Sequence, residues 1–562
     1  MEVPTLHDIC LRTVATLSDT LGWELMKDLP QHVLSSLIEL LPFLCLNDIH
    51  DGLLDRGVDP QHVWMKHYRE GFKYSGRREF WLLQQSSNEC DWRQRYLDFC
   101  SNKLLRQIAQ FQRLFCDDVV NDKITKALTN PLDSIVQHGH VNKNKSHSKY
   151  SPKAINIWGS ACNILSTNTV AKDILTDTVE EVTFEHLVSS QVDKVHQLIC
   201  HLLMQGHIHT INIKDVKSTF FNEFFKCLRL RSQISPGDGI HTFNPSHNRC
   251  AENSEPDLVL PPSICNALSR LKRVSLVSVE FHEASLKILK SLFLNMDKLD
   301  EIELIDNGIP STMNVLTCLG LLTDDRQRSL SIIKYEHNAI LGCFATIQEI
   351  IRHQGHIDTI CCITHLSLEF CSMTELQLYQ LFSVLSENKK MMFLSVYGNQ
   401  IDSMQPSLLK LFQDGCLQGL DLGQTKFTLT GSGVTTDFVT ELLATMMTNR
   451  HLRYLGLAST MLSDACLLKL ATGITDEAFD SELYSIDISF NRRISPEGLR
   501  AFGQELLLSF KPTKLRYLRL QHNYTSGLES DYFKDLHNVV NVHKAGPSED
   551  AETDFNDHVA NM

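Results

Sequence analysis

The sequence predicts an α/β protein in which a small α-helical module precedes a solenoid of repeated strand–helix units. Two observations support this prediction. From about residue 271 an apolar pattern returns at intervals of roughly 30 residues, and before residue 150 the apolar positions are spaced as in helices. The composition also allows a large core, because 43% of the 562 residues are hydrophobic and 21% are charged.

The repeat has the form L-x-x-L-x-L-x-x-[NCT]-x-L, and its clearest copy begins at Leu299. Each L-x-L predicts a short strand with one buried face, and the residues that follow predict an amphipathic helix, as in 284–293. Such a unit is too small to bury its own apolar face, so the units should stack into a solenoid. Weak copies start at Val179 and Ile208, and the remaining strong copies start at Leu271, Leu330, Ile363, Met391, Leu417, Leu452, Leu483 and Leu515.

This pattern resembles the leucine-rich repeats of the ribonuclease-inhibitor type. The predicted solenoid is curved, and its strands line the concave side. The polar position of the repeat can hydrogen-bond backbone groups where the chain turns out of the strand. It is occupied by Asn307, Asn338, Asn399, Asn491 and Asn523, with Cys371, Thr425 and Thr460 in other copies.

The strand residues between the leucines should project onto the concave face, because side chains alternate along a strand. Together they are expected to form an extended protein-binding surface. We select Glu369, Tyr397, Asp487 and Arg519 as candidate substrate contacts, since Tyr and Arg are frequent among binding hot spots.

The N-terminus carries a different motif. Thr5 followed by Asp8 is typical of a helix start, and a helix from there places Leu6, Cys10 and Val14 on one stripe. An amphipathic helix that packs on its own domain would show the same stripe. The pattern T-L-x-x-x-C-x-x-x-V also resembles the BC box, the short helix by which substrate receptors bind elongin C. The resemblance implies that Thr5, Leu6, Cys10 and Val14 contact elongin C, with elongin B as a further partner.

A leucine-proline pair, Leu29-Pro30, follows at the place where SOCS-box-type receptors carry a cullin box. The resemblance implies that this pair contacts cullin 5 or cullin 2, which would bring a RING protein. The cullin 5 form L-P-x-P would need a proline at His32. The same stretch also resembles an F-box, which opens with Leu-Pro, ends near a tryptophan, here Trp64, and binds Skp1 and cullin 1. The preceding BC-box-like motif favours elongin.

Taken together, the two ends of the chain resemble the elongin-BC-box receptors that carry leucine-rich repeats. Members of this family are substrate-recognition subunits of cullin–RING ubiquitin ligases. The resemblance implies a non-catalytic chain that holds an unidentified protein substrate. A leucine-rich-repeat scaffold outside any ligase is an alternative, as is a GTPase regulator, which would need a polar transition-state-stabilising group on a loop.

Charge and motifs argue against several other classes of function. With 53 basic and 67 acidic residues the net charge is −14, so we expect no general attraction to nucleic acid or to an anionic membrane. No apolar run is long enough to span a membrane and no secretory signal is visible, so a cytoplasmic or nuclear location is expected. The 17 cysteines include no C-x-x-C pair and no catalytic motif is found, so we expect no metal, no cofactor and no enzymatic activity.

Changes in pattern and composition divide the chain into segments. They are an adaptor module at 1–60, a helical linker region at 61–150, weak repeats at 151–231, an inserted polar loop at 232–263, the main repeats at 264–543 and an acidic tail at 544–562.

Overall fold

The computed structural model divides the chain into two compact units, 1–241 with 260–267, and 242–259 with 268–562. The candidate elongin contacts Thr5, Leu6, Cys10 and Val14 lie outside the described residues, as does the tail 544–562. The structure describes residues 13, 26–41, 43–71, 91–111, 117–129, 131, 150–217, 219–220, 262–281, 289–307, 330–338, 363–386, 388–400, 408, 410–411, 416–424, 436–448, 451–476, 482–508, 515, 517–520, 523 and 541–543.

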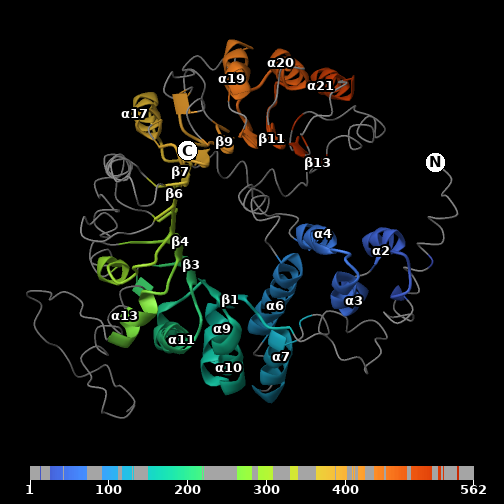
Figure 1. Ribbon diagram of the computed structural model, residues 1–562. Helices are drawn as coiled ribbons and strands as arrows, with labels where there is room; N and C mark the ends of the chain where they lie inside the picture. The colour runs from blue at the N-terminus through green and yellow to red at the C-terminus, as the bar shows by residue number, and fades with distance from the viewer. Residues whose placement is uncertain are drawn as a thin grey trace, which may run out of the picture. The chain divides into compact units, whose positions relative to one another are not determined.

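The first unit begins with helices that share one hydrophobic core (Figure 1). Trp64 and Trp92 are fully buried in this core, and the Trp64 Nε1–H donates to His50 Nδ1 at 3.1 Å. The core therefore continues past residue 60, where the sequence analysis ended the adaptor module. The helices that contribute to this core are α2 (Gln31–Leu37), the 3-10 helix η1 (Ile38–Leu40), α3 (Phe43–Asp55), α4 (Gln61–Gly71) and α6 (Trp92–Phe111), and α7 (Asp117–Thr129) follows α6.

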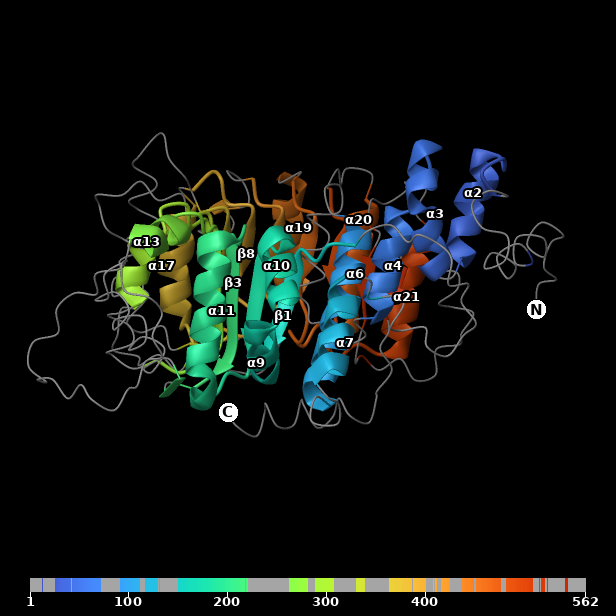
Figure 2. The same ribbon diagram turned by 90° about the horizontal axis from the view of Figure 1, so that it is seen from below.

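Three parallel strands follow in the first unit, β1 (Ala154–Trp158), β2 (Glu181–Glu185) and β3 (Thr210–Val216). The weak repeats at Val179 and Ile208 provide β2 and β3, whereas β1 had no copy of the pattern to mark it. Helices α9 (Gly159–Thr167), α10 (Thr169–Thr178) and α11 (Val192–Gln205), with the 3-10 helix η3 (Ser189–Gln191), follow these strands along the chain. The three α-helices lie on the same side of β1–β3 in both views (Figure 1, Figure 2).

The second unit is a ladder of parallel strands in sequence order. The first residue of each predicted copy from Leu271 to Leu515 is at most 4% exposed, so the repeat frame is confirmed. Helices α17 (Glu375–Leu385), α19 (Thr436–Thr448), α20 (Asp464–Thr475) and α21 (Pro496–Leu508) cover one side of the strands. The strands are β4 (Arg273–Val279), β5 (Glu301–Ile305), β6 (Ile332–Glu336), β7 (His365–Ser367), β8 (Phe393–Ser395), β9 (Gly419–Asp421), β10 (Tyr454–Gly456), β11 (Ser485–Asp487), β12 (Tyr517–Arg519) and β13 (Asn541–His543).

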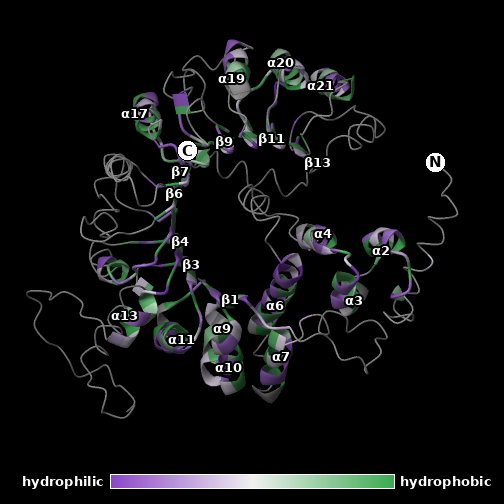
Figure 3. Ribbon diagram, in the orientation of Figure 1, coloured by the Kyte–Doolittle hydropathy of each residue, from purple (hydrophilic) through white to green (hydrophobic). Residues whose placement is uncertain are grey.

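Amphipathic helices follow several of the described strands. In Figure 3 hydrophobic and hydrophilic residues alternate along the helices, as expected where one face packs on the strands. In α20, for example, Leu467, Leu470 and Ile474 are buried. The helix α13 (Pro262–Leu268) precedes β4. None of the helices in the described part of the chain has both the length and the apolar character needed to cross a bilayer.

The polar position of the repeat forms the expected ladder of hydrogen bonds. Asn338 Nδ2–H donates to the Leu304 carbonyl at 2.9 Å, and Asn491 Nδ2–H donates to the Leu457 carbonyl at 2.8 Å. Each side chain thus binds the backbone of the preceding repeat. The residue before the polar position has a left-handed backbone in several repeats, including His337 at φ 54°. In these repeats the turn ends the strand.

Candidate functional site

The Leu29-Pro30 pair lies in a turn that is fixed before any partner binds. The Pro30 carbonyl accepts the first backbone hydrogen bonds of α2, and Pro30 itself is exposed. Arg56, at the end of α3, donates from Nη2 to the Leu29 carbonyl at 3.0 Å and from Nη1 to the Lys27 carbonyl. Gln31 Nε2–H donates to the Gly57 carbonyl at 3.0 Å. The turn is therefore preformed, with Leu29 partly buried against the hydrophobic core and Pro30 at the surface.

Two large apolar side chains of the helical module remain at the surface. Leu40, in η1, is 41% exposed and Leu54, in α3, is 48% exposed, whereas the adjacent Leu41 and Leu53 are buried in the core. Their side chains add apolar area to the surface of the module. Sequence reasoning missed them, although their position one residue off the buried stripe was a visible signal.

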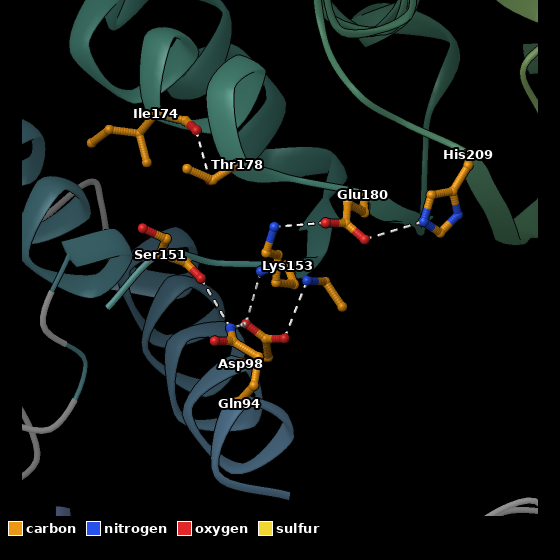
Figure 4. Close-up of polar contacts among 9 residues, drawn as sticks. Gln94, Asp98, Ser151, Lys153, Ile174, Thr178, Glu180 and His209 are labelled. Carbon is orange, nitrogen blue, oxygen red and sulfur yellow. Dashed lines mark hydrogen bonds and ion pairs between the residues drawn. The ribbon is translucent and has the colours of Figure 1, made fainter. Parts of the chain in front are cut away.

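Helix α6 joins this module to the first strand through a buried carboxylate (Figure 4). Asp98 accepts hydrogen bonds from the Tyr150 hydroxyl at 2.6 Å, from the backbone N–H of Lys153 at 3.1 Å and from that of Ala154 at 3.2 Å. Gln94 Nε2–H donates to the same group at 3.0 Å and also to the Ser151 carbonyl at 2.9 Å. Burial raises the pKa of Asp98 to about 6, although the hydrogen bonds act in the opposite direction.

A second side chain of α6, one turn further on, completes the joint. Asn102 Oδ1 accepts the Asn156 N–H at 2.7 Å, and its Nδ2–H donates to the Ala154 carbonyl at 3.3 Å. Together with Asp98, it binds backbone groups on the edge of β1 that does not pair with β2. An open strand edge would otherwise expose these groups. Part of the segment predicted as a linker is therefore a cap on the first repeat.

The strand face of the second unit carries a compensated charge network on β4–β6. Arg273 lies 3.4 Å from Glu301 and 3.2 Å from Glu303, and Lys334 lies 2.9 Å from Glu301 and contacts Glu303. Burial by itself would raise the pKa of Glu303, but Lys334 and Arg273 outweigh it and hold that pKa well below its ordinary value. Within these repeats the two cations offset the charges of the two carboxylates.

The four candidate substrate residues form two separate pairs. Asp487 on β11 and Arg519 on β12 are buried, with Oδ2 and Nη1 3.6 Å apart. Tyr397 is also buried, and its ring occupies the space where a Cβ at Gly423 would lie. Glu369 is half-exposed and follows β7, one repeat before Tyr397. The ion pair of Asp487 and Arg519 lies on β11 and β12, whereas Glu369 and Tyr397 follow β7 and β8.

Sequence reasoning missed three neighbours of Glu369, which are Glu336, His337 and Phe370. Glu336 is the residue equivalent to Glu369 in the preceding repeat, and it accepts from Ser367 Oγ at 2.5 Å. His337 stacks on Phe370, with ring centroids 4.4 Å apart and an angle of 25°. The available signal was their shared position in the repeat, just before the polar residues Asn338 and Cys371.

Among the residues that the structure describes, no group of three or more His, Cys, Asp or Glu could hold a metal ion. Burial raises the pKa of Cys100 to about 11 and that of Cys162 to about 12. These two thiols stay protonated and are unsuited to act as nucleophiles.

Comparison with known proteins does not identify a family for this chain. No protein-family model and no curated protein matches this chain. Among solved structures, a leucine-rich-repeat protein of Leptospira interrogans is similar at 14% identity and a TM-score of 0.26, over 70% of this chain and 90% of that chain. The leucine-rich-repeat interpretation therefore rests on the order of the parallel strands, the buried repeat positions and the asparagine ladder.

Proposed function

We propose that this chain is the substrate-recognition subunit of an elongin BC–cullin–RING ubiquitin ligase. In this proposal the N-terminal BC-box-like segment binds elongin C, the Leu29-Pro30 turn contacts cullin, and the repeats hold the substrate. The chain does no ubiquitin chemistry itself, since that is the role of the RING protein and its partners.

The observation that carries the proposal is the preformed Leu29-Pro30 turn on a compact helical module. A short motif that docks on a partner binds more tightly when its conformation is fixed in advance, because little conformational entropy is then lost. Arg56 and Gln31 fix the turn, and the exposed Leu40 and Leu54 offer apolar area on the same module.

The joint between α6 and β1 gives the proposal a mechanical basis. A ligase receptor must hold its substrate at a defined distance from the ubiquitin-transferring subunits. Asp98 and Asn102 on α6 bind backbone groups at the first repeat strand. These hydrogen bonds restrict the movement of the helical module relative to that strand. Within the first unit, the proposed adaptor end and the first repeats thus have a fixed geometry.

At a finer level, the chain resembles leucine-rich repeat-containing protein 41, an elongin-BC-box protein. The resemblance is carried by the N-terminal motif, by Val63-Trp64 and Trp92-Arg93, by the segment 486–491 and by the closing residues 554–562. It supports cullin 5 or cullin 2 as the cullin partner, in the cytoplasm or the nucleus.

The test is co-purification from cells, with the bound subunits identified by mass spectrometry. Replacing Leu6 and Cys10 by glutamate should abolish recovery of elongins B and C, because loss of an interface anchor commonly costs ~2 kcal/mol or more. A matched variant with Arg12 and Ala15 replaced by glutamate, on the opposite face of the predicted helix, should retain them. Undiminished elongin binding by a folded Leu6/Cys10 variant would refute the proposal, and recovery of Skp1 with cullin 1 would assign the chain to the F-box class.

A further inference from the structure

One edge of the second unit gathers positive charge, although the chain as a whole has a net charge of −14. Lys389 and Lys390 lie in the turn before β8, and Arg453 directly precedes β10. All three side chains are exposed, and in the described part of the chain none of them has an ion-pair partner. Among the described residues that lead into β8–β11, Glu482 is the only carboxylate. This edge therefore carries an excess of positive charge.

Backbone hydrogen bonds align the edge across four repeats. The Gln418 N–H donates to the Met392 carbonyl and the Arg453 N–H donates to the Gln418 carbonyl, both at 2.7 Å. The Tyr484 N–H donates to the Arg453 carbonyl at 2.8 Å. These four residues directly precede β8, β9, β10 and β11, so Arg453 and Tyr484 are neighbours at the same end of the strands.

The two lysines are positioned by the turn in which they lie. Asn388 Oδ1 accepts the Lys390 N–H at 3.0 Å, and Asn388 Nδ2–H donates to the Ile363 carbonyl at 2.9 Å. Ile363 begins the preceding repeat and is buried. The turn is thus anchored to the repeat frame, which keeps both lysines at the edge.

Two tyrosines add aromatic surface to this edge. Tyr484 is 36% exposed and Tyr517 is half-exposed, and their ring centroids are 5.1 Å apart at an angle of 59°. Arginine and tyrosine are among the residue types found most often in binding hot spots. We call the surface formed by Lys389, Lys390, Arg453 and Tyr484 the basic edge.

The acidic tail of the same chain has a complementary composition. Its carboxylates are Glu549, Asp550, Glu552, Asp554 and Asp557, and Phe555 stands among them. Carboxylates attract the cations of the basic edge, and a phenyl ring can pair with a tyrosine ring. One short segment, 549–557, therefore offers both kinds of contact.

The tail is long enough to reach the basic edge. It follows His543, the last residue of β13, and Glu549 comes six residues later. An extended chain covers ~20 Å in six residues, whereas the three steps from β13 to β10 span ~15 Å at the usual spacing of strands. Because the tail belongs to the same chain, its effective concentration at the edge is on the order of millimolar, so a weak contact is sufficient.

We propose that the acidic tail binds the basic edge of its own repeats. Carboxylates of 549–557 pair with Lys389, Lys390 and Arg453, while Phe555 packs on Tyr484. The tail then shields this edge from acidic segments of other proteins. The inference concerns the second unit alone, so it does not depend on the ligase proposal.

The test is amide hydrogen exchange of residues 549–557 in the full chain, followed by mass spectrometry. A synthetic peptide of residues 544–562 gives the exchange rate of the unbound tail. The test variant combines Lys390→Glu with Arg453→Glu and reverses two charges of the basic edge. The matched control combines Lys410→Glu with Lys469→Glu, which changes the net charge equally at two exposed lysines in helical segments.

We expect residues 549–557 to exchange about tenfold more slowly in the wild type than in the peptide, as for a contact of ~0.1 mM affinity at a millimolar effective concentration. The test variant should exchange at the rate of the peptide, and the control should keep the wild-type rate. Exchange of the strand amides in the same samples shows that each variant is folded.

Three results would overturn the inference. The first is equal exchange in the wild type and the peptide, which would mean that the tail is unbound. The second is equal loss of protection in the test variant and the control, which would indicate attraction by net charge and not by the basic edge. The third is protection that grows with protein concentration, because the tail would then bind a second copy of the chain.

Discussion

Asp98 should be the residue on which the joint between the helical module and the repeats depends most. Replacing it with alanine removes the acceptor for the Tyr150 hydroxyl and for the N–H groups of Lys153 and Ala154. A lost hydrogen bond costs about 1 kcal/mol, and a buried donor left without an acceptor costs about 1–3 kcal/mol. Tyr150 is buried and the two amides are partly buried, so we expect a local loss of about 3–5 kcal/mol.

Amide hydrogen exchange measures this local loss of stability at individual residues. Since 1.4 kcal/mol corresponds to a factor of ten, the Lys153 and Ala154 amides should exchange at least about a hundredfold faster in Asp98→Ala. The matched control is Asp122→Ala on α7, whose ion pair with Lys126 is exposed and contributes little. If exchange at residues 153 and 154 were the same in the wild type and in Asp98→Ala, the carboxylate would not be what holds β1 to α6.

Three further predictions concern pH, the cullin contact and the substrate surface. Because the folded pKa of Asp98 is raised to about 6 from 3.8, the stabilisation that comes from its protonation is fully present below pH 3.8 and is lost as pH rises through 6, by about 3 kcal/mol. Chemical unfolding across pH 4–7 should show this fall in the wild type relative to Asp98→Asn, and parallel curves would contradict it. Changing Leu29 and Pro30 to alanine should reduce cullin recovery and spare elongin in pull-downs, and loss of both together would mean that the module had unfolded. Replacing Tyr397 and Arg519 together should reduce substrate capture and ubiquitination, while elongin and cullin association stays unchanged. If a variant with an unaltered thermal unfolding curve captured as much substrate as the wild type, the substrate site would lie elsewhere.

The sequence alone determined the repeat architecture of the second unit. The apolar spacing sets which side of each strand is buried, and the asparagine at the turn binds backbone groups within one repeat of its own position. Both are short-range effects that every copy reproduces, so nine copies reinforce one another. The strand β1 escaped detection because it stands alone before the first copy, and β13 because it follows the last one.

Only the tertiary structure decided what several individual side chains do. From the sequence, Asp98 is one more polar residue on a helix, but the segment 150–154, more than 50 residues later, brings Tyr150 and two amides to it. Tyr397 reads as a free strand residue, yet the absence of a side chain at Gly423 in the next repeat lets its ring pack down and become buried. The environment of a side chain is set by residues distant in sequence, and local periodicity carries no information about them.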